Sequence, residues 1–290
     1  HNHPASLQFF HPELEKKYGG FLNLYTNLMI HVGDPSKITY FDYLMSFTSD
    51  YVILKIYEET KIKFENIDWL TEDLNQAFRH YKYYFPNKPV PTVYTCISGF
   101  NQSVVSSDSL LGISLDKYLG RECPLYKRLD SPAYLKLRMA DYYIPTDCML
   151  AWANMEFPYN DSVDNLLSRI IYKGKIQYFI DAMFPKMEDS LKMGYSAKQL
   201  KWAQKYEELM WKYFVEKKLL FNDSRLEIQK YTEIGPFTNS FGQNSPDRTG
   251  VWIGWKIVKS YMKNNPEISL PDLMKNNDYQ SILTLSRYKP

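Results

Sequence analysis

Histidine is the residue type whose distribution says most about the chemistry open to this chain. An HExxH zinc site needs two imidazoles one helical turn apart, and a Ser-His-Asp or Cys-His site needs one imidazole beside a nucleophile. The chain has no HExxH, and no histidine follows His80. A nucleophilic site would have to recruit His31 or His80, so we expect no catalytic residue, no metal and no cofactor. The five histidines are His1, His3, His11, His31 and His80.

Paired carboxylates are the second chemistry to consider. Glycosidases hold two acids about 5–10 Å apart across a cleft, and the middle of this chain is rich in aspartate. Asp161 opens one predicted helix and Asp147 lies in the first turn of another, where a negative side chain favours the helix dipole. We therefore favour structural roles, with a carboxylate-based hydrolase as the alternative. The aspartates are Asp108, Asp116, Asp141, Asp147, Asp161, Asp164 and Asp181.

The stretch SPDRTGVWIGWKIVKSYMKNNP, residues 245–266, predicts a helix over 246–264. Ser245 is a good N-cap and Pro246 a good first residue. The glycines at 250 and 254 share one face, so another element can pack closely against it. Arg248 is a cation beside the positive helix end, which favours a structural ion pair. We expect a buried core helix; the alternative places Arg248 and Trp252 at the rim of a cleft.

The composition narrows the classes of partner. Lys plus Arg is 35 and Asp plus Glu is 33, which gives a net charge of +2. No strongly basic block stands out, so nucleic acid is not expected as the main partner. No apolar run approaches the roughly 20 residues that cross a bilayer. The chain begins without Met and without a signal peptide, so we expect a trimmed form whose targeting segment has been removed.

The helical and strand patterns predict an α+β protein that is mainly α. We expect a single domain over 1–290, with a disordered tail at 1–6, a helical part at 7–86, a small antiparallel sheet at 87–120 and a helical part at 131–290. Period-two alternation around a Gly-containing turn predicts a hairpin of residues 91–98 and 103–107. LLGISLD, residues 110–116, is a candidate third strand.

The expected helices follow from apolar spacing, capping residues and proline positions. The segment from Pro12 to Ile30 should break near its adjacent glycines. Further helices are expected within 36–60 and 66–86, from Pro132 and from Pro145, over 161–184 with Asp161 or Ser162 as cap, within 196–221, and at 269–276 and 278–286.

Several stretches resemble the gliding motility-associated lipoprotein family (GldB-like) of Bacteroidetes. They are VYTCISGF, LLGISLDKYLG, YYIPTDCM, IYKGKIQYFIDAMFP, GPFTNSFGQNSPDRTGVWIGWKIVKSYM and the terminal SRYKP. The resemblance covers about Tyr83 to Pro290 and is loose before that. It implies a lipidated cysteine at an N-terminus. None of the three cysteines lies near the start, so we expect that anchor upstream of His1.

The same region is distantly similar to predicted zinc proteases, which have a sheet, then an HExxH helix, then a helix with a Glu-Gly pair. Here the first helix has no histidine, and Lys173 with Gly174 stands where Glu-Gly would be expected. A protonated lysine cannot bind zinc. The likeness implies a zincin-like scaffold without its metal, a pseudo-metalloprotease. The side chains that would line the former cleft are Asp147, Gln177, Tyr178 and Asp181.

Together these observations favour a non-catalytic, lipid-anchored domain on the periplasmic side of a bacterial envelope membrane. Its expected partner is another envelope protein or a glycan. The alternative is a hydrolase, either carboxylate-based or a degenerate metallopeptidase. The candidate cleft or binding residues are Asp147, Lys173, Gln177, Tyr178, Asp181, Arg248 and Trp252.

Overall fold

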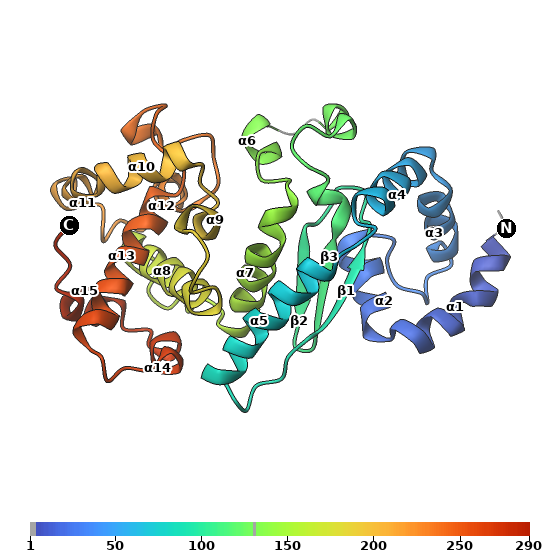
Figure 1. Ribbon diagram of the computed structural model, residues 1–290, viewed down its shortest axis with the longest axis horizontal. Coiled ribbons are helices and arrows are strands. Elements are labelled where there is room, and N and C mark those ends of the chain that lie inside the picture. Colours follow the sequence, from blue (N-terminus) through green and yellow to red (C-terminus); the bar gives the residue numbers. More distant parts are fainter. Residues whose placement is uncertain (1–3, 130–131) are drawn as a thin grey trace. The chain divides into compact units, whose positions relative to one another are not determined.

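The computed structural model describes residues 4–129 and 132–290 and is mainly helical with one small sheet (Figure 1). The predicted α+β class is therefore confirmed. Of the expected tail, residues 1–3 lie outside the described part, while residues 4–6 form the first turn of α1 (Pro4–Tyr18). The predicted break falls at Gly19, where φ is 51°, and α2 (Gly20–Leu24) follows.

The chain divides into two compact units. Unit 1 holds the residues up to Leu74 and those from Pro89 to Met155, and unit 2 holds Asn75–Lys88 and Glu156–Pro290. Helix α5 (Asp68–Tyr84) contributes its first turns to unit 1 and the rest to unit 2. The proposed boundaries within a single domain of 290 residues stay a prediction.

The N-terminal helices of unit 1 are shorter than the sequence pattern suggests. After α2 the chain makes one π-helical turn, η1 (Tyr25–Met29). The next apolar stretch forms two helices, α3 (Tyr40–Ser49) and α4 (Tyr51–Lys63). Asp50 separates them because its backbone is extended and its carboxylate accepts the N–H groups of Val52 and Ile53, which caps α4.

The sheet of unit 1 contains β1 (Thr92–Cys96), β2 (Val104–Ser107) and β3 (Leu110–Ser114) in the order β1-β3-β2. β3 pairs parallel with β1 and antiparallel with β2. The predicted hairpin of β1 with β2 is therefore wrong, and the sheet is mixed rather than antiparallel. The two-residue connection between β2 and β3 favours their direct pairing, whereas residues 97–103 form a longer excursion that leaves room for β3.

The rest of unit 1 is a chain of short elements followed by α7. They are η2 (Leu115–Tyr118), η3 (Pro124–Arg128), α6 (Ala133–Lys136), η4 (Asp141–Tyr143) and α7 (Ile144–Glu156). The helix expected from Pro132 is thus only one turn long. Four residues after its end, Ala140 is extended and forms an antiparallel bridge with Leu119.

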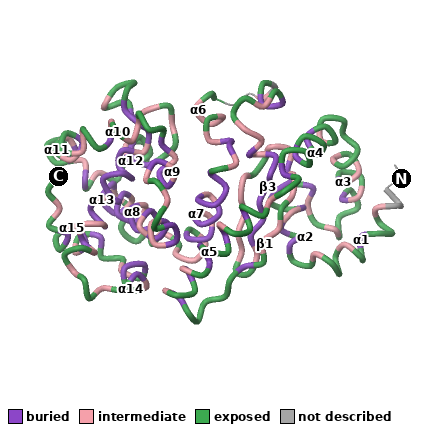
Figure 2. Tube along the Cα trace, in the orientation of Figure 1, coloured by how far each residue is buried: buried purple, intermediate pink, exposed green. Residues whose placement is uncertain are grey.

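Unit 2 is built on two helices, α8 (Leu166–Met183) and α13 (Thr249–Asn264), whose residues are largely buried (Figure 2). They meet backbone to backbone. A Cβ added to Gly174 would lie 2.3 Å from the carbonyl carbon of Gly254, and one added to Gly254 would lie 1.7 Å from the carbonyl oxygen of Ile170. The expected close approach at the glycine face is therefore present, and Trp252 and Trp255 of α13 are fully buried.

Both core helices begin later than expected. α8 starts at Leu166 because Asn165 and Ser168 form a reciprocal capping box, so neither Asp161 nor Ser162 is its cap. α13 starts at Thr249, and its N-cap is Arg248, which has φ 48°. Ser245 does not cap α13, since its hydroxyl instead bonds the carbonyl groups of Thr238 and Gly242.

The remaining helices of unit 2 surround this pair. The expected helix within 196–221 is divided at Tyr206 into two helices. The bounds are α9 (Asp189–Met193), α10 (Ala197–Lys205), α11 (Glu207–Glu216), α12 (Arg225–Thr232), α14 (Leu270–Lys275) and α15 (Tyr279–Ser286), with a short turn η5 (Asn239–Phe241) before α13.

A single methyl group at Gly254 tests the contact between α8 and α13. We expect Gly254→Ala to lower the free energy of unfolding by at least about 3 kcal/mol, because the new Cβ would overlap the Ile170 carbonyl. Chemical denaturation measures the change. Gly235→Ala is the control, since its Cβ would meet only the Phe237 oxygen at 3.8 Å. Similar stability of the two variants would contradict the backbone contact.

Candidate functional site

Two of the predicted residues, Tyr178 and Asp181, line a pocket in unit 2. Its volume is about 1160 Å³, and its other walls come from the end of α5, from α9, from α13 and from the start of α14. The carboxylate of Asp181 accepts three donors. Lys192 Nζ lies 2.7 Å away, Trp255 Nε1 lies 2.8 Å away and Lys259 Nζ lies 3.0 Å away. Asp181 therefore joins α8, α9 and α13 as a structural hub.

The second carboxylate of this pocket is also paired. Asp189 lies 3.5 Å from Lys192 Nζ, and the Lys259 ammonium group stacks over the Trp255 ring at 3.8 Å. Lys192 is buried, so its charge depends on these partners. The cluster has as many cations as carboxylates, which is the pattern of a structural ion-pair network.

The other predicted residues of unit 2 are occupied by internal partners. Lys173 donates to Glu233 and to the Thr232 carbonyl, and Gln177 donates to the Lys192 carbonyl. These bonds tie α8 to neighbouring segments, so neither side chain lines the pocket described above.

Arg248 and Trp252 behave as the core-helix interpretation predicts. The Arg248 guanidinium pairs with Asp247 and donates to the Met193 carbonyl. Trp252 is fully buried, and its Nε1 donates to Glu207 at 3.0 Å. Within unit 2 Trp252 is therefore not at a cleft rim.

Asp147 belongs to unit 1, unlike the other six candidates. It lies in the first turn of α7, as expected, and accepts the Tyr118 hydroxyl at 2.9 Å. The Arg138 guanidinium is 3.5 Å away. Tyr118 and Arg138 both belong to unit 1, and the expected place of Asp147 in a cleft with residues of α8 stays a prediction.

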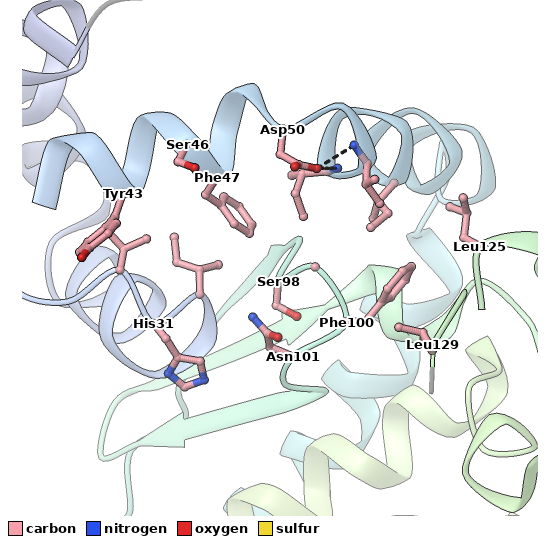
Figure 3. Close-up of a pocket in the computed structure, with 16 residues that line it drawn as sticks. His31, Tyr43, Ser46, Phe47, Asp50, Ser98, Phe100, Asn101, Leu125 and Leu129 are labelled. Carbon is pink, nitrogen blue, oxygen red and sulfur yellow. Dashed lines mark hydrogen bonds between the residues drawn. The ribbon is translucent and has the colours of Figure 1, made fainter. Parts of the chain in front are cut away.

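Unit 1 contains a pocket that the sequence analysis missed. Its volume is about 720 Å³, and its lining is mostly apolar. One wall consists of α3 and the start of α4, and the facing wall is the segment Ser98–Asn101, which follows β1 (Figure 3). We call this pocket the α4 groove. Its lining residues are Ile30, His31, Val32, Tyr43, Ser46, Phe47, Asp50, Val52, Ile53, Ile56, Ser98, Gly99, Phe100, Asn101, Leu125 and Leu129.

The buried carboxylate of Asp116 holds the Ser98–Asn101 wall in place. Its two oxygens accept the backbone N–H groups of Ser98 at 3.1 Å and Phe100 at 2.7 Å. Lys117 Nζ donates to the Phe100 carbonyl at 3.0 Å. Burial raises the pKa of the Asp116 carboxyl, while the two N–H groups act in the opposite direction. Asp116 and Lys117, which do not line the groove, therefore fix the backbone of this wall.

Residues with positive φ occur at this groove as well as in unit 2, where Lys218, Arg248 and Arg287 have it. Gly99, Phe100 and His31 all have positive φ, at 68°, 67° and 54°. Such a conformation is rare for a bulky residue such as Phe and costs of order 1–3 kcal/mol. A Cβ at Gly99 would lie 2.8 Å from the end of the Ile53 side chain of α4, and the φ of 68° disfavours other residue types there.

The groove combines aromatic rings with a few polar groups. Phe47 and Phe100 face its interior from opposite walls, and the Asn101 amide lies between them (Figure 3). A mostly apolar concavity with a few polar groups is typical of ligand sites. In the sequence the only signal was the turn Gly99–Gln102, which the analysis used for a hairpin and not for a binding site.

Two further observations bear on the chemistry. Among the described residues, no group of three or more His, Cys, Asp or Glu side chains is placed to hold a metal ion. Over the same part of the chain, no helix combines the length and the apolarity that crossing a bilayer demands. The implied kinship with zinc proteases stays a prediction.

Lys175 is a buried cation that the sequence analysis missed, although it lies between the candidates Lys173 and Gln177. Its side chain is buried, and Nζ donates to the Asn276 carbonyl at 2.6 Å beside the Tyr279 ring. Burial lowers its pKa to about 8. Because this pKa lies below the ordinary value of 10.5, the unfolded chain binds more protons between about pH 8 and pH 10.5.

The Lys175 ammonium group therefore destabilises the fold below about pH 8, and stability should rise with pH above that. We expect Lys175→Met to gain about 1–3 kcal/mol at pH 7 and to flatten the rise. Urea denaturation from pH 7 to pH 10.5 measures both effects. Exposed Lys201→Met is the control and should keep the wild-type slope. A steep rise that survives in Lys175→Met would refute the assignment to this group.

Comparison with known proteins gives one finding. The sequence model of the family described as gliding motility protein GldB matches residues 2–290. No curated protein and no solved structure matches the chain.

Proposed function

Because the chain belongs to the family of the gliding motility protein GldB, whose members are envelope lipoproteins, we propose that it is their binding domain. It acts without catalysis on the periplasmic side of an envelope membrane, held there by a lipid anchor upstream of His1. Its partner is another envelope protein or a glycan. The membership covers nearly the whole chain, so the role applies to both units.

The observation that carries this proposal is the α4 groove. Phe100 has positive φ, and the buried carboxylate of Asp116 holds its backbone N–H in place. Strained residues of this kind gather at binding sites, where the surrounding structure holds them in one geometry. The groove also exposes Tyr43 and Val52 at its mouth, which is a surface that a partner can cover.

The hydrolase alternative requires two facing acids that are not already committed to cations. The nearest arrangement is Asp181 and Asp189 in unit 2, which both pair with Lys192. Both carboxylates are thereby held in ion pairs with a buried ammonium group. The geometry therefore favours binding over carboxylate catalysis.

Filling the groove tests the proposal. Ser46 is exposed on α3 and lines the groove, so Ser46→Trp should occupy it without disturbing the core. Ser49→Trp, also exposed on α3 but outside the groove, is the matched control. We expect wild type and Ser49→Trp to retain a component of the solubilised native envelope, and Ser46→Trp to lose it. Calorimetric titration with that purified component should show at least about tenfold weaker binding to Ser46→Trp.

The two variants must first show the same thermal unfolding temperature as the wild type. Equal retention by all three proteins would mean that the groove is not the binding surface. Turnover of the retained component by the purified domain would instead support the hydrolase alternative.

A further inference from the structure

A second, smaller pocket lies along the same helix as the α4 groove. Its volume is about 320 Å³, and it lies between the last turns of α4 and the end of β1. The two pockets are lined by consecutive residues of the same segments. Ile56 and Ser98 line the α4 groove, and their neighbours Tyr57 and Ile97 line the smaller pocket. The residues of the smaller pocket are Tyr57, Thr60, Lys61, Phe64, Glu65, Thr95, Cys96, Ile97 and Leu115.

β1 presents an unpaired edge to this smaller pocket. It is an edge strand of the sheet, and the Thr92 N–H bonds the Ser109 carbonyl on the β3 side. In a parallel pair, alternate residues direct both backbone groups to the same neighbour. Tyr94 and Cys96 therefore face β3 as Thr92 does, and the backbone groups of Val93 and Thr95 face outward. Such an edge is a template for another strand.

A buried hydroxyl points to the same place. Thr60 is 4% exposed, and its Oγ1 has no hydrogen-bond partner in the described part of the chain. A buried polar atom without a partner costs free energy, so each such atom needs a physical reason. Thr60 and Thr95 both line the smaller pocket, so a main chain bound there would supply a partner for the hydroxyl.

We propose that the two pockets together bind one extended peptide segment of a partner protein, which adds as a strand to the outer edge of β1. This inference rests on the proposed function and selects a protein rather than a glycan as the partner. Main-chain bonds to Val93 and Thr95 align the segment, the Thr60 hydroxyl accepts or donates one bond to it, and an apolar side chain enters the α4 groove.

Length and charge agree with such a ligand. From Ile53 to Phe64, α4 rises about 16 Å, which equals about five residues of extended chain. Lys61 and Glu65 flank the smaller pocket, and neither has an ion pair among the described residues. An exposed cation and an exposed anion in this position complement a peptide that carries both signs, and the apolar α4 groove complements one large side chain.

The first measurement is selection of ligands from a random library of short linear peptides displayed on phage, with the whole domain as bait. The strongest peptide is synthesised and titrated by fluorescence anisotropy. Thr95→Pro removes the outward N–H without touching the bonds to β3, and we expect at least about tenfold weaker binding. Thr95→Val keeps the N–H and should bind as the wild type does.

Two readouts do not depend on how well Thr95→Pro folds. Thr60→Val removes the buried hydroxyl and keeps the shape, and we expect binding to weaken by about threefold to tenfold. N-methylation of the peptide, one amide at a time, should abolish binding at alternate positions only, because alternate amides of a strand face the sheet. Circular dichroism and thermal unfolding establish that each variant is folded.

The outcomes separate this inference from the proposed function. Strand addition would be overturned by failure to select any peptide, by wild-type affinity in both Thr95→Pro and Thr60→Val, or by N-methyl sensitivity that does not alternate along the peptide. Soluble cell-wall glycan fragments are titrated in parallel, and binding of these alone, lost in Ser46→Trp, would overturn the peptide and leave the proposed function standing. If the wild-type domain also retains no component of the native envelope, the proposed function itself is overturned.

Discussion

The carboxylate of Asp116 is the contact on which the candidate site depends. A buried carboxylate must find donors for both oxygens, and here the segment after β1 supplies one backbone N–H to each oxygen. Meeting that demand curls the segment into positive φ at Gly99 and Phe100 and turns the Phe100 ring toward α4. The shape of the α4 groove is therefore a consequence of satisfying one buried charge.

Unit 2 depends on a different constraint, which is the close contact of its two core helices. There the two core helices touch through glycine backbones, which leaves no room for side chains between them at that point. The large side chains of α13 are consequently directed to its flanks, where the Nε1 groups of Trp252 and Trp255 meet Glu207 and Asp181. Glu207 and Asp181 thus accept hydrogen bonds from the buried tryptophans of the core. Unit 1 instead keeps aromatic and amide groups open at its groove.

These two patterns are the basis on which we propose binding rather than hydrolysis for this chain. Its paired acids are already neutralised by lysines within unit 2. In unit 1, a positive-φ phenylalanine lines an apolar groove, and exposed apolar side chains such as Tyr43 and Val52 lie beside it. For an envelope lipoprotein of the GldB family, a rigid groove beside an open strand edge offers a defined surface for a partner.

Local chemistry determined much of this protein without any tertiary information. Apolar spacing predicted the main helices, and adjacent glycines predicted the break after Tyr18. The glycine spacing of α13 predicted its close packing. Helix starts were missed where a distant partner competed for the capping residue, as Thr238 does for Ser245. Strand order, the buried positions of Asp116 and Lys175, and the groove itself were decided only by tertiary structure. Each depends on which groups meet across long stretches of sequence, and a residue type alone does not reveal its partner.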